Sequence, residues 1–576
     1  MGQITYRANL SAKIFPFISD NWGRTVIVPQ YDNTFNRELS SQEDPDRDVG
    51  IPQAYYMHNV IPTSQGFQSV GYTTVLAASA SGTFTNIFLL TDAADNKAYL
   101  GIGTGGNLYI NTGSGWTLKG TYAYTGVVTT AYVSGVTYIY LGGYGCITYN
   151  FAGAAFAAVT LTALDTTKIL GICGALGYLI AWNSPVSGVT LALTSAVGSP
   201  ILLGATTTGV IINQPVSGAN IPIGSYVVEI NPGVSITINQ SATIAGLINF
   251  IFSPQAAAIA WSSTIDPTDF TPSLVTGAGG GSVEGARGAI TFCLAHTLGF
   301  IVYTTVNAVA AVYSNNARYP FAFRELLSSG GLSDQSLIGY DANTGNHYAY
   351  TTSGFQLIST SQTQTIFPEI TDFIAGKLFE DYDEITKVFS RSTLSAPMAK
   401  LLHVVSDRYL IISYGISSLT HAIVIDLSTK RFGKLKIPHV AVLEYQLTSV
   451  GVTETPRQSL AFLQSDGTLK IVDFSAYSAT SNGVIALGKY QFVRARLMTL
   501  DTIAIENVYP QAPFSCSILS SINGKTQISS TPDVLETADR QVTYGSRATG
   551  INHAIVFQGS FLIESLVLQF HIHGKR

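Results

Sequence analysis

The sequence has little charge and few cysteines, and it lacks long apolar runs. Charged residues make up 11% of its 576 residues, against about 25% in ordinary soluble domains. The four cysteines show no CxxC spacing, so we expect reduced, buried thiols rather than a disulfide framework. They are Cys146, Cys173, Cys293 and Cys516.

Segments that would target the chain to a membrane are also missing from the sequence. No uninterrupted run of about 18 apolar residues occurs, so no membrane span is expected. The first 20 residues contain Arg7 and Lys13 and no continuous apolar core, so we expect no signal peptide. These patterns predict synthesis and folding in a cytoplasm.

The charge balance restricts the possible partners. The formal net charge is −5, with 30 Lys and Arg against 35 Asp and Glu. Tight sequence-independent DNA binding depends on Lys and Arg neutralising phosphates. The composition therefore argues against a protein that grips nucleic acid.

Strand and turn formers dominate what is present. Short apolar strands alternate with Asp-Asn and Gly-Gly turns, as in Phe88–Leu90, Ala98–Leu100 and Asn107–Ile110, a pattern typical of β-hairpins. Cycles of three or four strands recur roughly every 40–50 residues, the spacing of propeller blades. We predict an all-β chain with a β-propeller of six or seven blades, in preference to a β-sandwich or a β-helix.

One cycle is interrupted by a segment of different character. Leu179–Trp182 resembles Ile259–Trp261, and Glu229 is the only charged residue in 187–254 between them. Because insertions in loops add little closure entropy, we predict a small inserted β-domain. The expected organisation is an extended N-terminal arm (1–70), propeller (71–186), inserted domain (187–254), propeller (255–484) and C-terminal sandwich-like platform (485–576).

Candidate catalytic residues cluster around the turn that follows Trp261. Asp266, Asp269 and Glu284 lie close in sequence, and a glycosidase needs paired carboxylates or an arginine cluster facing a pocket. Asp266 and Asp269 are better interpreted as turn formers. Ser262 and Ser263 do not lie in a GxSxG elbow, and SxDxGxTW repeats of the sialidase type are absent.

Other candidate ligand sites have simpler interpretations. Glu380–Glu384 lacks the spaced oxygen ligands and central Gly of a calcium loop, so a solvated acidic loop is expected. His571 and His573 share one face of the last strand, but a surface or interface pair is favoured over a metal site. Gly277–Gly281 has no phosphate-loop Lys-Ser/Thr and is expected to be a flexible turn. We therefore predict no catalytic, cofactor-binding or metal site, and no enzyme.

The order of motifs resembles the nozzle, or tail tubular protein B, of short-tailed bacteriophages. The resemblance rests on Pro52–Pro62 in the arm, Trp261–Phe270, Gly299–Tyr303 leading into Ala311–Tyr313, and the ending Phe561–Arg576. It implies a homo-hexameric ring below the head-to-tail adaptor protein. Genomic DNA would pass through this ring without tight binding, and tail fibres or a distal tail plug would be further partners. The implied location is the virion, after assembly in the host cytoplasm.

Two alternatives of other classes stay open. A receptor- or carbohydrate-binding propeller of a phage tail would use exposed aromatic side chains, and one blade contains Tyr138, Tyr140, Tyr144 and Tyr149, although core packing explains these better. A glycan-degrading enzyme is disfavoured by the missing acid pair.

Overall fold

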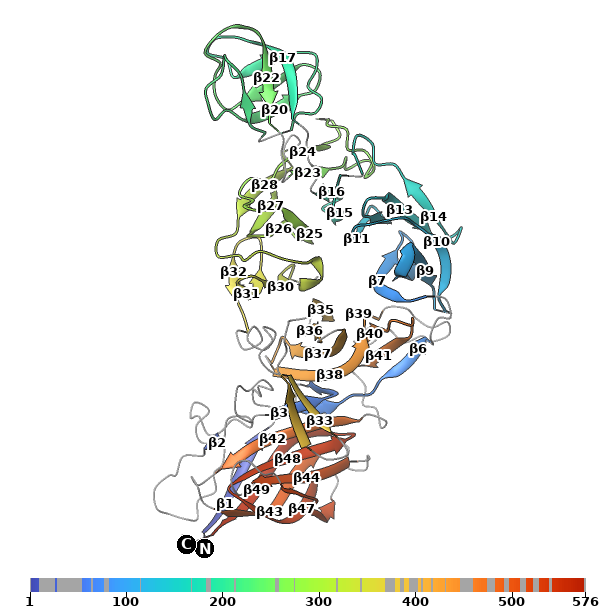
Figure 1. The fold of residues 1–576 in the computed structure, drawn as a ribbon, viewed down its shortest axis with the longest axis vertical. Helices are drawn as coiled ribbons and strands as arrows, with labels where there is room; N and C mark the ends of the chain where they lie inside the picture. Colours follow the sequence, from blue (N-terminus) through green and yellow to red (C-terminus); the bar gives the residue numbers. More distant parts are fainter. Residues whose placement is uncertain are drawn as a thin grey trace. The chain divides into compact units, whose positions relative to one another are not determined.

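The structure, a computed structural model, is almost entirely β (Figure 1). Its only helices among the described residues are two three-residue 3-10 turns, η1 (Thr104–Gly106) and η2 (Gln335–Leu337). The chain divides into two compact units, residues 79–366 and residues 1–78 with 367–576. The described residues are 2–9, 26–27, 54–63, 66–76, 82–367 (without 114, 167, 183–187, 212–213, 254–257, 274, 317–319 and 342–343), 379–383, 388–392, 402–405, 408–415, 418–429, 431–445, 459–473, 482–491, 497–507, 514–521, 528–537 and 541–573.

Five four-stranded antiparallel sheets follow one another in unit 79–366. Their strands are β7 (Phe84–Thr91), β8 (Lys97–Gly103), β9 (Asn107–Asn111) and β10 (Thr117–Thr121); β11 (Val128–Val133), β12 (Val136–Leu141), β13 (Gly145–Asn150) and β14 (Ala155–Val159); β15 (Gly171–Ala175), β16 (Tyr178–Trp182), β23 (Ala258–Trp261) and β24 (Gly279–Ser282); β25 (Ile290–His296), β26 (Gly299–Thr304), β27 (Ala308–Tyr313) and β28 (Phe321–Glu325); β29 (Ile338–Tyr340), β30 (His347–Thr351), β31 (Gly354–Ile358) and β32 (Thr363–Thr365).

Each of these sheets packs face to face on the next. One apolar cluster joins the first and second sheets, and three further clusters join the second to the third, the third to the fourth and the fourth to the fifth. Strands in the middle of a sheet, such as β26, are buried along their whole length, whereas edge strands such as β14 are largely exposed. A middle strand that is buried on both faces therefore carries a continuous run of apolar residues instead of alternating apolar and polar residues.

Two more groups of four strands lie in the other unit. The first consists of β35 (Leu402–Val405), β36 (Tyr409–Tyr414), β37 (Leu419–Asp426) and β38 (Arg431–His439). The second consists of β39 (Ala441–Glu444), β40 (Ser459–Leu463), β41 (Leu469–Asp473) and the early strand β6 (Thr73–Leu76). A shared apolar cluster packs them together. The predicted all-β propeller fold is thus confirmed, with seven such four-stranded groups among the described residues.

A six-stranded sheet interrupts the third propeller sheet. Its flanking strands β16 and β23 pair directly, with Ile180 opposite Trp261 and Trp182 opposite Ile259. The resemblance between Leu179–Trp182 and Ile259–Trp261 therefore reflects neighbouring strands of one sheet. The inserted strands are β17 (Val189–Ser195), β18 (Ile201–Leu203), β19 (Val216–Ser217), β20 (Val227–Asn231), β21 (Ser235–Ile238) and β22 (Gly246–Phe252).

The C-terminal strands form two packed sheets around a common apolar core that includes Ile485, Phe557 and Leu568. These strands are β42 (Gly483–Gln491), β43 (Met498–Asn507), β44 (Phe514–Ser521), β45 (Ile528–Ser530), β46 (Asp533–Thr537), β47 (Gln541–Gly550), β48 (Asn552–Gly559) and β49 (Leu562–Ile572). This arrangement is the expected sandwich-like platform.

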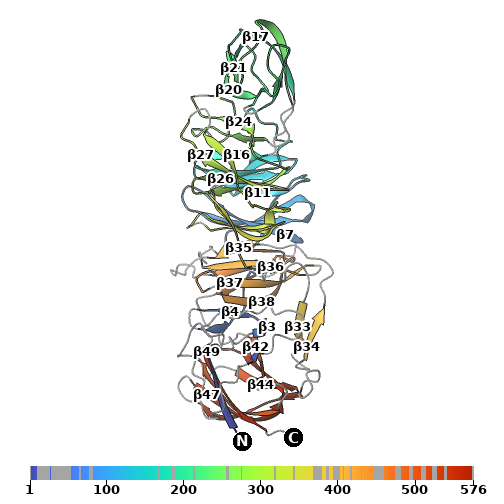
Figure 2. The same ribbon diagram turned by 90° about the vertical axis from the view of Figure 1, so that its left-hand side faces the viewer.

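Strands within the expected extended N-terminal arm (1–70) join the platform. Among the described residues, β1 (Gly2–Asn9) pairs with β49 along its whole length, which Figure 2 shows as a blue strand in the red sheet. Strands β2 (Val26–Ile27) and β3 (Ala54–His58) pair with β42, and β4 (Val60–Pro62) and β5 (Phe67–Ser69) link β38 to β49. Local periodicity could not reveal the pairing with β38, β42 and β49, because these strands lie hundreds of residues away.

The compact units also divide the chain differently from the expected domains. The β35–β38 group lies in the same unit as the platform, because a continuous hydrogen-bonded sheet runs from β38 through β4 and β5 to β49. Lys434 in β38 is opposite Val60 in β4. The expected boundary near residue 484 therefore falls within one compact unit.

Candidate functional site

The turn that follows Trp261 holds its two aspartates as structural residues. Asp266 Oδ1 accepts hydrogen bonds from the Thr268 amide at 2.9 Å and the Thr268 hydroxyl at 2.7 Å, and these bonds lower the pKa of Asp266. Asp269 Oδ1 accepts from the Thr271 amide at 2.9 Å. Each carboxylate caps its own turn, and Glu284 is exposed on the following loop. The geometry thus matches the turn-former interpretation.

The two serines beside this turn support the backbone. Ser262 is fully buried; its hydroxyl accepts from the Leu179 amide at 2.9 Å and donates to the Ser263 carbonyl at 3.1 Å. Ser263 Oγ accepts from the amides of Ile265 and Asp266. Both hydroxyls are thus engaged by backbone groups of the turn and its neighbouring strand.

The glycine run Gly277–Gly281 is not simply a flexible turn, and this expectation is corrected. Gly277 has a left-handed φ of +72°, but Gly279–Gly281 lie in β24 and pair with β23. An added Cβ at Gly279 would lie 3.3 Å from the Trp261 ring, and one at Gly280 would lie 3.0 Å from the Ile259 carbonyl oxygen. The run lacks side chains because β24 packs closely against β23 and its tryptophan.

The acidic stretch Glu380–Glu384 is another correction. Residues 380–383 belong to β33 (Phe379–Asp383), which pairs with β34 (Val388–Ser392), rather than to a loop. Glu384 lies outside the described residues. Phe379 and Tyr382 in this strand are aromatic residues of a type enriched in strands.

The two C-terminal histidines have separate polar partners. The His571 imidazole contacts the Asp501 carboxylate, and His573 Nε2 is hydrogen-bonded to Thr499 Oγ1 at 2.6 Å. A bulge between Leu500 and Thr502 places Asp501 against β49. Within the described residues no group of three potential metal-ligating side chains occurs, so a surface pair remains the interpretation.

The tyrosines of the second sheet serve mainly its core. Tyr138 and Tyr140 are buried, and Tyr140 donates to backbone carbonyls at 2.8 Å. Tyr149 packs edge-on against Phe151 and Phe156. Tyr144 is 45% exposed and packs edge-on against Tyr122. One exposed ring of four does not make a stacking platform for a sugar.

All four cysteines are buried and unpaired, as expected. Burial raises the pKa of the Cys146 thiol to about 12 and raises the thiol pKa of Cys173, Cys293 and Cys516. Reactive thiols need an environment that lowers the pKa. These side chains therefore serve as small apolar core residues.

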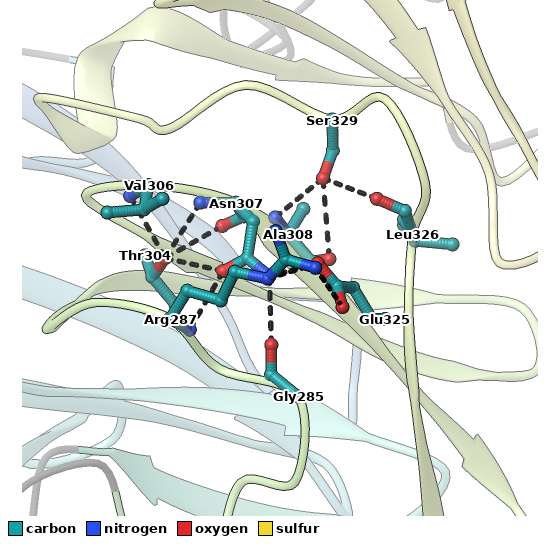
Figure 3. A network of polar contacts seen from close by, with 9 residues as sticks. All are labelled: Gly285, Arg287, Thr304, Val306, Asn307, Ala308, Glu325, Leu326 and Ser329. Atoms are coloured by element: carbon teal, nitrogen blue, oxygen red, sulfur yellow. Dashed lines mark hydrogen bonds and ion pairs between the residues drawn. The ribbon is translucent and has the colours of Figure 1, made fainter.

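The sequence reasoning missed a dense polar network at one end of the fourth sheet (Figure 3). Arg287 forms a two-pronged ion pair with Glu325, with Nε–Oε1 2.8 Å and Nη2–Oε2 2.9 Å. Asn307 donates to Glu325 Oε1 at 3.0 Å and to the Gly285 carbonyl at 2.8 Å, and accepts from the Arg287 amide at 3.1 Å. Residues from three segments of chain are thus joined through one carboxylate and one amide.

Hydroxyl groups extend this network along the same turns. Thr304 Oγ1 donates toward Asn307 and accepts from its amide at 2.9 Å. Ser329 Oγ accepts from the Ala308 amide at 2.8 Å and donates to the Leu326 carbonyl at 2.7 Å. These groups have their partners within the protein, and the one carboxylate is neutralised by the arginine. The network can fix the turns around β26–β28, but it lacks the second acid that glycoside hydrolysis requires.

A buried histidine adds a second polar link between the fourth and fifth sheets. His347 is fully buried, with Nδ1 paired to the Tyr303 hydroxyl at 2.8 Å and Nε2 to the Ala295 carbonyl at 2.7 Å. Burial lowers its pKa to about 3. The imidazole is therefore neutral at physiological pH and acts as a fixed hydrogen-bonding group.

Comparisons with known proteins give limited information. No family model and no curated protein matches the chain. Solved structures with some likeness include BamB from Moraxella catarrhalis, 6% identical over 74% of this chain and 99% of that one, with a TM-score of 0.31. YCF48 from Cyanidioschyzon merolae is 13% identical over 70% and 98%, with a TM-score of 0.32. Such scores carry no functional argument, and the fold assignment rests on the sheets.

A search of the described residues for helices long and apolar enough to cross a bilayer finds none.

Proposed function

We propose that this chain is a structural virion protein, the tail nozzle of a short-tailed bacteriophage. Six copies would form a ring below the head-to-tail adaptor and make the channel for genome ejection. The protein would act in the phage tail, without catalysis, after assembly in the host cytoplasm.

The observation that best supports this proposal is where two motifs of the resemblance lie. Pro52–Pro62 contributes β3 and β4, and Phe561–Arg576 contributes β49. The two motifs are joined through β5: Val60 in β4 is opposite Ser69, and Phe67 in β5 is opposite Ile563 in β49. Segments separated by about five hundred residues of sequence thus meet in one body. This is consistent with the two motifs belonging to one architecture shared with the nozzle family, rather than with a chance similarity of sequence at the two ends of the chain.

The charge pattern is compatible with a conduit. A channel for DNA must not retain the duplex, and retention depends on basic side chains that release counterions. The net charge is −5, and Arg287 and Arg408 are each paired with a carboxylate, of Glu325 and Asp426.

The proposal is tested by the mass of the purified chain, alone and mixed with the adaptor ring of the same virus. We expect a monomer or ring-forming species that binds the adaptor ring with six copies. A stable trimer that ignores the adaptor and binds cell-surface glycans would replace the nozzle with a receptor-binding propeller.

A further inference from the structure

The inserted domain has an almost uncharged surface with many exposed aliphatic side chains. Glu229 is the only charged residue in 187–254. Ten of the large hydrophobic residues that are exposed lie in this one domain: Val197, Ile201, Leu203, Ile223, Tyr226, Val228, Val234, Ile244, Leu247 and Ile251. Exposed apolar side chains mark a contact surface where they gather in one patch, whereas single ones are normal.

The most exposed of them lie at one end of the domain. Strands β17 and β22 pair along their lengths, from Val189 opposite Phe252 to Ser195 opposite Gly246. The chain enters and leaves at Val189 and Phe252, so the turns after Ser195 and before Gly246 lie at the far end. By the rise of a strand this end is roughly 20 Å from the linkers.

Hydrogen bonds tie three turns together at this end. Ser195 Oγ donates to the Ile244 carbonyl at 2.8 Å and accepts from Asn220 Nδ2 at 3.2 Å. The Thr243 amide donates to the Asn220 carbonyl at 2.8 Å, and the Gly198 amide to the Ala242 carbonyl at 2.9 Å. The three turns are therefore held as one rigid tip with many of their backbone groups paired.

Each turn presents one aliphatic side chain. Val197 is 68% exposed, Ile223 102% and Ile244 54%, and Leu247 beside them is 71% exposed. These four residues define the apolar tip. At 102% exposure, the Ile223 side chain is covered by no neighbouring residue.

We propose that the apolar tip inserts into the apolar layer of a lipid bilayer. Projecting aliphatic side chains gain most from a soft apolar medium that closes around them. The paired turns satisfy many of the backbone groups that a bilayer would otherwise leave without hydrogen bonds. With Glu229 as the only charge of the domain, attraction to anionic headgroups plays no part. This inference does not depend on the nozzle assignment.

A second copy of the chain is the less suitable occupant. Protein interfaces are built on flat or complementary patches enriched in Tyr, Trp, Phe, Met and Arg. The apolar tip, made of Val197, Ile223, Ile244 and Leu247, has none of these residue types. Self-association through the tip is therefore kept as an outcome of the test.

The experiment uses the full chain and neutral phosphatidylcholine vesicles in a flotation assay. We expect the wild type to float, with no gain from added anionic lipid and no loss at high salt. The triple variant V197S/I223S/I244S should lose the bound fraction by about tenfold or more, because it removes most of the apolar area. The matched control I265S/V275S/L327S changes three apolar residues outside the inserted domain, whose exposed fractions are 78%, 89% and 78%. It should float like the wild type.

A second variant tests insertion directly. Ile223→Trp should show a blue-shifted emission with vesicles and quenching by lipids brominated in their acyl chains. The proposal is overturned if the wild type ignores neutral vesicles, if it needs anionic lipid, or if both triple variants behave alike. It is also overturned if V197S/I223S/I244S only abolishes self-association, since a second copy would then be the occupant.

Discussion

Removing the buried carboxylate of Asp426 should destabilise the β35–β38 group strongly. The side chain is fully buried at the end of β37. Its Oδ1 accepts from the Ser428 amide at 2.9 Å, the Ser428 hydroxyl at 2.6 Å and the Thr429 amide at 3.2 Å. Its Oδ2 accepts from Arg408 Nε at 3.3 Å and Nη2 at 3.0 Å. Asp426→Ala therefore removes the turn acceptor and the counter-charge of Arg408 together.

The magnitude follows from these contacts. Breaking a buried ion pair costs about 3–5 kcal/mol, and Arg408 is 31% exposed, so we expect the lower end, about 3 kcal/mol. Asp426→Asn keeps an acceptor for the turn but loses the charge, and should cost about 2 kcal/mol. Ser428→Ala removes one hydroxyl bond and should cost about 1 kcal/mol.

The pH dependence gives an independent test. Although burial raises the pKa of Asp426, hydrogen bonds from Arg408 and Ser428 outweigh it, so the folded pKa lies below the ordinary value. The stabilisation is therefore present above the unfolded pKa of about 3.9 and is lost as the pH falls through the folded pKa. The gap between wild type and Asp426→Asn should shrink below about pH 4.

The assay is urea unfolding by intrinsic fluorescence, with hydrogen exchange of peptides from residues 419–439 to locate the effect. The three variants should rank Asp426→Ala, Asp426→Asn, Ser428→Ala in loss of stability. The proposed role of Asp426 would be wrong if Asp426→Ala unfolded at the wild-type urea midpoint. It would also be wrong if Asp426→Ala and Ser428→Ala lost the same amount of stability.

The remaining predictions concern the backbone, the insertion and DNA. Gly299→Ala should destabilise the protein by several kcal/mol, because φ is +150° and the new Cβ would lie 2.0 Å from the Ala311 carbonyl oxygen. Gly177→Ala, with φ of +83° and open space around the new Cβ, should cost only about 1 kcal/mol. Equal melting temperatures for the two variants would contradict this. Replacing 187–254 by a short Gly-Ser bridge should leave a soluble chain with its β circular dichroism, because Trp182 and Ile259 already pair; insoluble protein would show that the segment is needed by its sheet. The isolated chain should bind duplex DNA no more tightly than about 10⁻⁴ M at physiological salt; submicromolar binding with a steep salt slope by fluorescence anisotropy would contradict a conduit.

Local patterns in the sequence predicted the propeller sheets well. Hairpins such as β7–β8 carry their own turn signal: Asp92 Oδ1 accepts from the Ala94 and Asn96 amides at 2.9 Å. The insertion was visible because its surface lacks charge, which is a property of composition rather than of contacts. Both signals are read along one continuous stretch of sequence and need no knowledge of distant partners.

Long-range pairing could not be predicted in the same way. The N-terminal strands showed no clear periodicity, and their partners in β42 and β49 lie hundreds of residues away. The Asp501–His571 contact and the Arg287–Glu325–Asn307 network likewise join residues with no spacing signature. Gly279–Gly281 were mistaken for a turn because their lack of side chains reflects the neighbouring Trp261, which only the register of β23 and β24 reveals.

The central claim is most directly tested by electron microscopy of the purified chain bound to its adaptor ring. We expect six-fold averages in which this chain continues the adaptor ring around an open channel wider than a B-form duplex. The highly charged DNA, with about one charge per 1.7 Å, must pass through this channel without being held. Particles with three-fold symmetry, or a six-fold ring whose axis is closed by the propeller sheets, would contradict it.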